Sequence, residues 1–390
     1  MSSCFCVYPH CLMTANSDSV LIFNPKSKGR VIISDGRLAL WTKSHTSNVL
    51  PVYDQSRRLF EEAEHRRMGL FIGEVKAMPY MQGQAITLLS SMEKERRSLN
   101  HVTGWKIPSY INTVYLHFNN THYKAASSCM YSQIGYPHYD ATPSIMSCQA
   151  GEGMSALIRG TAVKTLYLCG DIDNVLTESL REVYEGNYSV VIRTFACEAD
   201  KIISLLRDYP DLNVEIMTDN RREYLNALRQ LISWSPTFLF VITDVSELGI
   251  YQNEEVEHAF IPVIYDAEKQ KGLLSQMRMT LEDIFNSVRS IKDCLMKEVV
   301  NSSAFGKISI DIHGNISSNE EYIGNVDNGT AFGLLTKWLQ KENNSWMLTR
   351  RKVSQCSDCL LSSLCPCVSI YERQGFIQTA CCNSGISRLK

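Results

Sequence analysis

Four cysteines near the end of the chain have the spacing of a metal site. Cys356 and Cys359 are separated by two residues, Cys365 follows after five more, and Cys381 comes fifteen residues later. A Cys-x-x-Cys turn directs two thiolates at one metal, and two further cysteines complete a tetrahedral shell. The spacing predicts one four-cysteine site. It does not separate an iron–sulfur cluster from zinc, since both accept four thiolates.

Further cysteines lie nearby and at the start of the chain. Cys367 and Cys382 are alternative ligands that could replace Cys365 or Cys381. A second group of possible ligands comprises Cys4, Cys6, His10 and Cys11. Their spacing matches no motif that we can justify, so a strand with free thiols is favoured over a metal site. The role of this group is left open.

Length and composition limit the classes of protein that these cysteines can belong to. The chain has 390 residues, 44% hydrophobic and 21% charged, which predicts a globular protein of two or three domains. The net charge of −2 does not show the excess of positive charge that is typical of nucleic-acid-binding proteins. No apolar run approaches the roughly 18 residues that span a bilayer, and the start lacks a basic signal-peptide region. We therefore expect a cytoplasmic protein without a membrane partner, whose cysteines are thiols or metal ligands.

The first third, residues 1–100, reads as a small sheet with helices. Apolar runs at 19–25 and 29–36 predict two paired strands, and 38–41 predicts a third. A helix is expected over 55–69, with one buried stripe formed by Leu59, Phe60, Ala63 and Met68. Such a module could pair an exposed strand edge with a peptide, or it could cap the next domain.

The middle, residues 105–298, alternates between strand and helix patterns. Strands are expected at 111–118, 163–168, 188–195, 212–217, 238–243 and 260–265, and helices at 199–207, 221–234 and 281–297. Repeated βα units predict an α/β fold with a parallel sheet. Five or six units indicate a partial barrel and not a complete eight-unit one.

The strand ends of such a barrel are where chemistry is expected. Asp171, Asp219 and Asp244 follow strands, but an Asp there more often caps the next helix. His117 and His122 could hold a metal but lack a third spaced ligand. No Gly-rich phosphate loop and no recognisable nucleophile motif is present. We therefore assign no catalytic residue.

The last third, residues 299–390, begins with a predicted hairpin around the turn His313-Gly314-Asn315. A helix is expected over 331–341, and the cysteines follow. A small domain of this kind needs a stabilising cross-link, and a cysteine-ligated metal can supply one.

This third resembles a known family. The features occur in the order hairpin, Gly324-Asn325-Val326, Trp346, Thr349-Arg350, Cys-x2-Cys-x5-Cys-Pro from Cys356, Ser369-x-Tyr371-Glu372 and finally Cys381. This order resembles the SPASM/twitch extension of radical SAM peptide maturases, and most of all the pseudo-radical-SAM proteins of Bacteroidales peptide-modification systems. Three segments upstream resemble the same family weakly: Val20-Leu-Ile-Phe-Asn, Arg67-Met68-Gly69 and Val114-Tyr-Leu-His-Phe-Asn-Asn.

The resemblance implies a degenerate radical-SAM-like partial barrel between the N-terminal module and a SPASM/twitch-like metal domain. A working enzyme of this family carries Cys-x3-Cys-x2-Cys after the first barrel strand, whereas the stretch from Asn119 to Cys129 holds one Cys. One thiolate does not hold that cluster. The turn that would bind the amino group of S-adenosylmethionine is reduced to Cys169-Gly170-Asp171. The resemblance thus implies that S-adenosylmethionine is not used.

The resemblance also implies a role and a cofactor. It suggests a non-catalytic accessory protein that binds a ribosomally made precursor peptide, a partner radical SAM maturase, or both. The hairpin lacks the cysteine of a complete SPASM module, and Ser369 stands in place of a further one, so a single site is expected. A 4Fe-4S cluster is favoured there and zinc is the alternative. Two other functions remain open: a divergent radical SAM/SPASM enzyme with an iron–sulfur cluster, and a zinc-stapled binding module.

Overall fold

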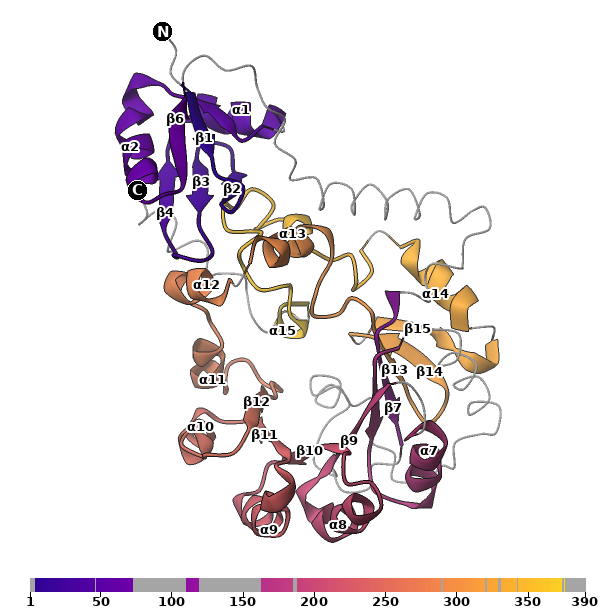
Figure 1. The fold of residues 1–390 in the computed structure, drawn as a ribbon. Helices are drawn as coiled ribbons and strands as arrows, with labels where there is room; N and C mark the ends of the chain where they lie inside the picture. Colours follow the sequence, from indigo (N-terminus) through magenta and orange to yellow (C-terminus); the bar gives the residue numbers. More distant parts are fainter. Residues whose placement is uncertain are drawn as a thin grey trace. The chain divides into compact units, whose positions relative to one another are not determined.

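The computed structural model describes residues 4–45, 47–72, 110–118, 163–184, 188–288, 290–319, 321–328, 331–341, 343–373 and 375 (Figure 1). The chain divides into two compact units. The first unit comprises Met1–Arg97, Arg278–Ser303 and Trp346–Lys390, and the second comprises Ser98–Met277 and Ala304–Ser345. These two units do not test the three domains expected from the sequence at 1–100, 105–298 and 299–390, which stay a prediction.

The first unit contains two small antiparallel sheets. One has the order β5-β1-β6, with β1 at Cys4–Val7, β5 at Val49–Pro51 and β6 at Gly69–Ile72. The other has the order β2-β3-β4, with β2 at Leu12–Ala15, β3 at Val20–Phe23 and β4 at Arg30–Ile33. The predicted pairing of the apolar runs at 19–25 and 29–36 is confirmed as β3 with β4. The predicted strand around Cys4 and Cys6 is confirmed as β1.

Two helices pack with these sheets. Helix α1 spans Gly36–Ser44, so the strand predicted at 38–41 is wrong. The reason is local: the Asp35 carboxylate accepts hydrogen bonds from the N–H groups of Arg37 and Leu38, which starts a helix before the apolar run begins. Helix α2 spans Arg57–His65 after a 3-10 turn at Asp54–Ser56. It buries Phe60 and Ala63 of the predicted stripe, and Leu59 is partly buried. The predicted end at 69 is wrong, because the helix ends at His65 and Gly69 begins β6.

The first unit is completed by segments from much later in the chain. These are α12 (Leu281–Ser287), α13 (Ile291–Val299), a 3-10 turn η5 (Arg350–Lys352) and α15 (Ile370–Arg373). The single helix predicted over 281–297 is therefore wrong. Val288 is extended and Ser290 caps a new helix, so the two helices are separate.

One apolar core of this unit joins β2, β3, α12, α13 and the cysteine-rich segment. Its buried members are Leu12, Leu21, Phe23, Ile284, Phe285, Val288, Cys294, Leu360, Leu361, Leu364 and Cys365. The Thr14 hydroxyl adds a hydrogen bond of 2.8 Å to the carbonyl of Leu360, 346 residues along the chain. The cysteine-rich segment and the sheet of β2, β3 and β4 therefore share a core.

The second unit is built on a large mixed sheet. In the described residues its order is β12-β11-β10-β9-β8-β7-β13-β14-β15. The strands are β7 (Thr113–His117), β8 (Thr165–Cys169), β9 (Ser189–Phe195), β10 (Asn213–Thr218), β11 (Thr237–Ile242), β12 (His258–Pro262), β13 (Lys307–Ile310), β14 (Asn315–Ser318) and β15 (Glu321–Asn325). The strands β7 to β12 are parallel, which confirms the six predicted strands and the parallel sheet. The predicted hairpin is confirmed as β13 and β14, and β13 pairs with β7.

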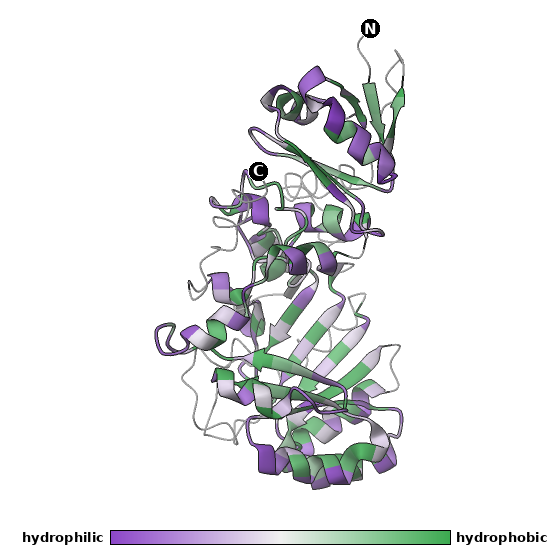
Figure 2. Ribbon diagram, turned by 90° about the vertical axis from the view of Figure 1, so that its left-hand side faces the viewer, coloured by the Kyte–Doolittle hydropathy of each residue, from purple (hydrophilic) through white to green (hydrophobic). Residues whose placement is uncertain are grey.

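Helices connect the parallel strands. They are α7 (Asn174–Tyr184), α8 (Ala199–Asp208), α9 (Arg221–Leu231) and α10 (Val245–Tyr251), followed by α11 (Lys271–Gln276) and α14 (Ala331–Leu339); shorter turns are η2 (Ala196–Glu198), η3 (Ile232–Trp234) and η4 (Val326–Asn328). Right-handed crossovers between neighbouring strands place such helices on one face of the sheet. Side chains such as Val114, Leu166 and Ile192 are buried on that face. Figure 2 shows hydrophobic bands along these strands. Across the ranges described here, we find no helix with the length and apolarity to cross a bilayer.

Candidate functional site

Of the three Asp residues that follow strands, one caps the next helix as predicted and two do not. Asp244 is the N-cap of α10 and forms a capping box with Glu247, so the predicted capping role is confirmed there. At α9 the cap is Asn220, so the capping role expected of Asp219 is wrong. Before α7, Asp173 accepts a hydrogen bond of 2.9 Å from the Leu176 N–H, which corrects the capping role expected of Asp171.

The other face of the parallel sheet carries a polar cluster that sequence reasoning missed. It consists of Tyr115 on β7, Tyr167 on β8, Arg193 on β9 and Glu215 on β10. Side chains of a strand alternate between faces, and the strand register pairs Tyr115 with Tyr167 and Arg193 with Glu215. Four neighbouring strands therefore present these side chains together.

Close contacts hold this cluster together. Arg193 forms an ion pair of 2.7 Å with Glu215, and their side chains are 13% and 19% exposed. The Arg193 guanidinium also lies 4.9 Å from the centre of the Tyr167 ring and 5.3 Å from that of Tyr115. The two tyrosine rings stack with centroids 4.5 Å apart. Cation–π contact and ion pairing together fix the guanidinium over the sheet.

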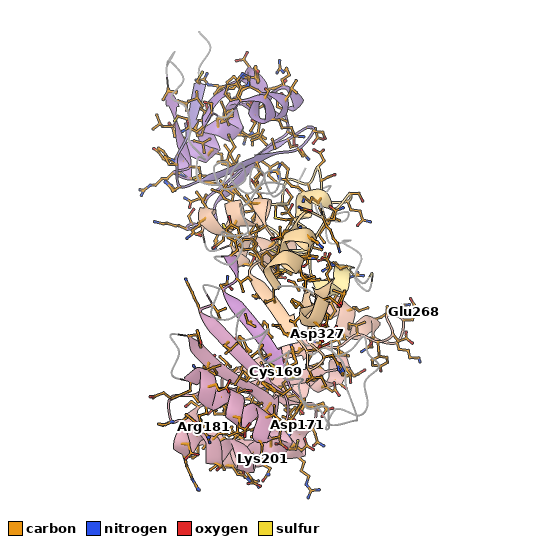
Figure 3. The ribbon with its side chains drawn as sticks, turned by 90° about the vertical axis from the view of Figure 1, so that its right-hand side faces the viewer. Cys169, Asp171, Arg181, Lys201, Glu268 and Asp327 are labelled. Carbon is orange, nitrogen blue, oxygen red and sulfur yellow. The ribbon has the colours of Figure 1, made fainter. Side chains whose placement is uncertain are left out.

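His117 and Cys169 lie one step further toward the carboxyl ends of β7 and β8 and are paired in register. Both are buried, and Cys169 is labelled with Asp171 in Figure 3. Burial, aided by the charge of Arg193, lowers the pKa of His117 to about 3. Burial raises the pKa of Cys169 to about 12. At neutral pH the imidazole is therefore uncharged and the thiol is protonated.

The two tyrosines are also held in one protonation state. Burial raises the pKa of Tyr115 to about 12. Burial and the charge of Glu215 raise the pKa of Tyr167. Apolar side chains continue the same face toward the other strands, among them Phe195, Met217 and Leu239. This face therefore combines a stacked tyrosine pair and an ion pair with an adjoining apolar surface.

The structure describes three of the four predicted metal ligands. Cys356 and Cys365 are buried, and Cys359 is partly buried with its sulfur accepting a hydrogen bond of 3.4 Å from the Leu361 N–H. Cys381 and its alternative Cys382 lie outside the described residues, as do His122 and Cys129. Over the parts of the chain that are described, no three His, Cys, Asp or Glu side chains gather in a group that could hold a metal ion.

The described thiols do not by themselves fit a metal or a cluster. The four-cysteine ligand set stays a prediction that depends on Cys381 or Cys382. The alternative ligand Cys367 has other contacts: its sulfur lies 3.2 Å from the N–H of Ser302 and 3.1 Å from the Ser302 hydroxyl.

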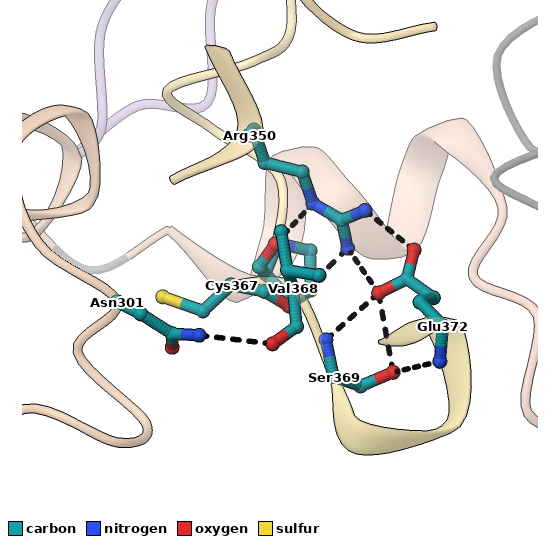
Figure 4. A network of polar contacts seen from close by, with 7 residues as sticks. Asn301, Arg350, Cys367, Val368, Ser369 and Glu372 are labelled. Carbon is teal, nitrogen blue, oxygen red and sulfur yellow. Dashed lines mark hydrogen bonds and ion pairs between the residues drawn. The ribbon is translucent and has the colours of Figure 1, made fainter. Parts of the chain in front are cut away.

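A buried ionic network supports the segment that contains these cysteines (Figure 4). Arg350 makes a two-fold contact with Glu372, in which Nη2 lies 3.0 Å from Oε2. The same guanidinium donates to the carbonyl oxygens of Pro366 (2.7 Å) and Cys367 (3.2 Å). Burial opposes the charge of Arg350, but the hydrogen bonds and charge of Glu372 outweigh it, so the pKa of Arg350 is raised. The network connects the Cys365-Pro366-Cys367 turn to η5, which contains Arg350, and to α15, which contains Glu372.

The motif Ser369-x-Tyr371-Glu372 has a local structural explanation. The Glu372 carboxylate accepts hydrogen bonds from the Ser369 N–H (2.9 Å) and hydroxyl (3.1 Å), and the Ser369 hydroxyl accepts one from the Glu372 N–H (3.3 Å). This is a capping box at the start of α15. The Ser-x-x-Glu spacing could have identified it from the sequence.

The N-terminal thiols belong to the sheets of the first unit. Cys6 on β1 accepts a hydrogen bond of 3.3 Å from the Asn48 amide, and burial raises its pKa. Burial raises the pKa of Cys11 to about 12. His10 stacks on Tyr8 with ring centroids 5.5 Å apart. These contacts favour a structural role for the group.

Comparisons with known proteins give weak similarity only. No family model and no curated protein sequence matches the chain. Similar solved structures include a histidine-tagged anSMEcpe with bound AdoMet, at 13% identity and a TM-score of 0.40 over 65% of this chain and 84% of that one. Native anSMEcpe with bound AdoMet and Cp18Cys peptide has 13% identity and a TM-score of 0.39 over 65% and 88%. SuiB of Streptococcus suis bound to S-adenosylmethionine has 10% identity and a TM-score of 0.32 over 97% and 100%. With each of these TM-scores below 0.5, the likenesses do not establish a common fold or activity.

Proposed function

We propose that this protein is a non-catalytic accessory protein of a cytoplasmic peptide-maturation system. It binds a ribosomally made precursor peptide or a partner radical SAM maturase. In this proposal the parallel sheet is a degenerate radical-SAM-like partial barrel and the C-terminal segment is a reduced SPASM/twitch-like module.

The observation that carries the non-catalytic role is geometric: His117 and Cys169 are buried, and Arg193 is paired with Glu215 on the polar sheet face. The thiol of Cys169 and the phenol of Tyr115 stay protonated at neutral pH, while burial keeps the imidazole of His117 uncharged. Arg193 and Glu215 neutralise each other. A general acid or base works best with a pKa near the operating pH, and none of the pKa values given for His117, Cys169 and Tyr115 lies there.

The sequence supports the same proposal at the carboxyl end of β7. A radical SAM enzyme needs three thiolates after this strand, and the stretch from Asn119 to Cys129 contains one. The stacked tyrosines and the Arg193–Glu215 pair instead give this face an amphipathic lining that suits a peptide segment, since aromatic and Arg side chains are enriched where proteins bind one another.

We further propose that Cys356, Cys359, Cys365 and Cys381 hold one structural metal, with a 4Fe-4S cluster favoured over zinc. If bound, it would supply folding energy to the C-terminal segment. Cys356 and Cys365 are already buried in the first unit, which suits ligands of a closed structural site.

The test uses protein purified without oxygen. The protein is incubated with dithionite and S-adenosylmethionine, and 5′-deoxyadenosine is measured by mass spectrometry. We expect none above the protein-free control, and its enzyme-dependent formation would refute the non-catalytic role. The neighbouring genes are searched for a short precursor peptide, and calorimetry with such a peptide is expected to give binding without consumption of S-adenosylmethionine.

A further inference from the structure

The central strand of the sheet β2-β3-β4 is buried on both faces, although small antiparallel sheets commonly leave one face to solvent. All four residues of β3 are fully buried. Side chains of a strand alternate between the two faces of its sheet. Val20 and Ile22 accordingly lie in one apolar core, and Leu21 and Phe23 lie in another. Two different sets of residues must therefore cover this sheet.

The neighbouring strands follow the same alternation. The strand register places Leu12 opposite Phe23, and it places Thr14 and Ile32 opposite Leu21 on either side. The apolar residues of this set all pack in the second core. We call the side of the sheet formed by Leu12, Thr14, Leu21, Phe23 and Ile32 the covered face.

The two faces are covered by different parts of the chain. The opposite face packs against residues from the same N-terminal range, among them Phe5, Leu38 and Phe60. The buried residues that pack on the covered face come from much later in the chain: Ile284, Phe285, Val288, Cys294, Leu360, Leu361, Leu364 and Cys365. The cysteine-rich segment, residues 356–365, therefore lies on the covered face, and we call it the strap.

Polar contacts attach the strap to this sheet and to α1. The Thr14 hydroxyl on the covered face donates to the Leu360 carbonyl at 2.8 Å. Asp358 lies inside the Cys-x-x-Cys turn, between two of the proposed metal ligands. Its carboxylate accepts a hydrogen bond of 3.0 Å from the Ser17 N–H, just after β2, and forms an ion pair of 2.8 Å with Lys43 on α1. The turn that carries the thiols is thus in direct contact with the N-terminal elements.

The strap has little structure of its own to keep it in place. Residues 356–365, which the structure describes in full, form turns and contain no helix or strand. The side chains of Lys43 and Asp358 are 45% and 50% exposed, so solvent screens their attraction. The position of the strap therefore depends on its apolar contacts and on what its thiols bind. A metal held by thiolates supplies binding free energy to such a segment.

We propose that ligation of the strap thiols by a metal holds the strap closed on the covered face, and that loss of the metal releases it. This inference rests on the proposed metal site and assigns that site control over the N-terminal sheet. Release uncovers Leu12, Leu21 and Phe23, which form an apolar surface of the kind that binds other proteins. Since coupling between two sites is reciprocal, the contacts of Thr14 and Lys43 with the strap also help to retain the metal.

The first experiment uses the full chain, purified without oxygen, before and after a chelator removes the metal, with the metal content measured in both states. Hydrogen exchange is followed residue by residue. Exchange of the β3 amides is expected to rise at least tenfold on metal removal, because one face of that strand loses its cover. The β1 amides, on the other core, are expected to change less than threefold, and the β10 amides of the second unit are expected to stay unchanged.

A matched pair of variants tests the reciprocal effect. Thr14→Val keeps the shape of the side chain but leaves the buried Leu360 carbonyl without the hydroxyl donor, and is expected to speed release of the metal to a chelator roughly tenfold. The control is Thr42→Val, because the Thr42 hydroxyl donates at 2.8 Å to the Leu38 carbonyl of its own helix. Its release rate is expected to stay within twofold of the unmodified protein. Equal rates in the two variants would overturn the proposal.

A second pair on the surface keeps the test sharp if Thr14→Val fails to fold. Lys43→Ala removes the ion pair with Asp358 and is expected to speed metal release about two- to fivefold at low salt, with the difference lost at about 1 M salt. Arg57→Ala breaks a similarly exposed pair with Glu61 inside α2 and is expected to leave the rate unchanged. Identical rates for the two variants at low salt would contradict the attachment of the strap through Asp358.

Three outcomes separate failure of the strap from failure of the metal site. Loss of the metal without faster exchange at β3 would overturn the strap and leave the metal site in place. Equal acceleration at β1 and β3 would show that the whole first unit unfolds, which also overturns the strap. Protein that contains neither iron nor zinc and takes up neither would refute the proposed metal site, and control of the sheet by the metal would fall with it.

Discussion

Removing the carboxylate of Glu372 tests the buried network beneath the cysteine-rich segment. The side chains of Arg350 and Glu372 are only 9% and 12% exposed, so solvent screens their attraction little. In Glu372→Ala the guanidinium keeps the carbonyl oxygens of Pro366 and Cys367 but loses its counter-charge. Breaking a buried pair from one side costs about 3–5 kcal/mol, because it leaves a buried charge uncompensated. The capping box with Ser369 is lost as well. We expect the free energy of unfolding of the first unit to fall by about 4 kcal/mol.

The assay must report on the first unit alone. Trp346 is fully buried in that unit, and ¹⁹F NMR of protein labelled with fluorotryptophan resolves its signal during urea unfolding. A double-mutant cycle with Arg350→Ala isolates the coupling between the two side chains, which we expect to be about 2–3 kcal/mol.

A surface pair supplies the matched control. Arg351 and Glu298 lie 2.9 Å apart in the same unit, but their side chains are 48% and 23% exposed. Glu298→Ala is therefore expected to cost less than about 1 kcal/mol. The reasoning is refuted if Glu372→Ala costs no more than this control, or if the two members of the cycle are additive.

The remaining predictions concern pH, a helix cap, a close backbone contact and the metal. Burial keeps the pKa of His117 at about 3, below that of the unfolded chain, so only the unfolded state gains a proton between pH 6.5 and 4.5. Stability of the second unit should therefore fall by about 1.4 kcal/mol per pH unit there, and urea midpoints of His117→Phe should lack this slope. Asp35→Ala should cost about 1 kcal/mol in thermal melts at pH 7. Hydrogen bonds from Gln55, Arg37 and the start of α1 outweigh burial and lower the pKa of Asp35, so its contribution is present above about pH 4 and lost on acidification; an equal cost at pH 2.5 would contradict this. Gly69→Ala should cost about 1–3 kcal/mol by chemical denaturation, because a Cβ there would lie 2.4 Å from the Cys6 carbonyl oxygen; unchanged stability would show that β1 and β6 can separate. Cys356→Ser should lower bound iron or zinc in elemental analysis, and full metal content would exclude this residue as a ligand.

The parallel sheet was predictable because its signal is local. Apolar, β-branched runs such as 188–195 and 238–243 alternate with helical patterns, and each run folds into a strand of the expected type. The predictions for 38–41 and 281–297 were wrong because in each case a single polar residue determines where a helix begins. The Asp35 cap turned the run at 38–41 into a helix, and the Ser290 cap starts α13 separately from α12. Both caps are hydrogen-bonding signals that hydrophobic periodicity does not register.

The polar sheet face could be predicted in part only. Arg193 and Glu215 are charged residues inside otherwise apolar strands, which indicates a paired or functional role. Their partnership depends on which strands are neighbours and in what register, and those relations come from the assembled sheet. The pKa values of His117 and Cys169 depend on burial by the same assembly.

The strands β7 to β12 and the hairpin of β13 and β14 can be predicted from the amino-acid sequence alone, because hydrophobic period and turn residues act over a few neighbouring positions. Which distant segments share a core becomes visible in the folded protein. Thr14 meets the carbonyl of Leu360, 346 residues away, and Leu12 packs in the same core as Cys365. Contacts of this range require closing a long loop against chain entropy, and they form when complementary apolar faces are buried together. No local pattern encodes that match.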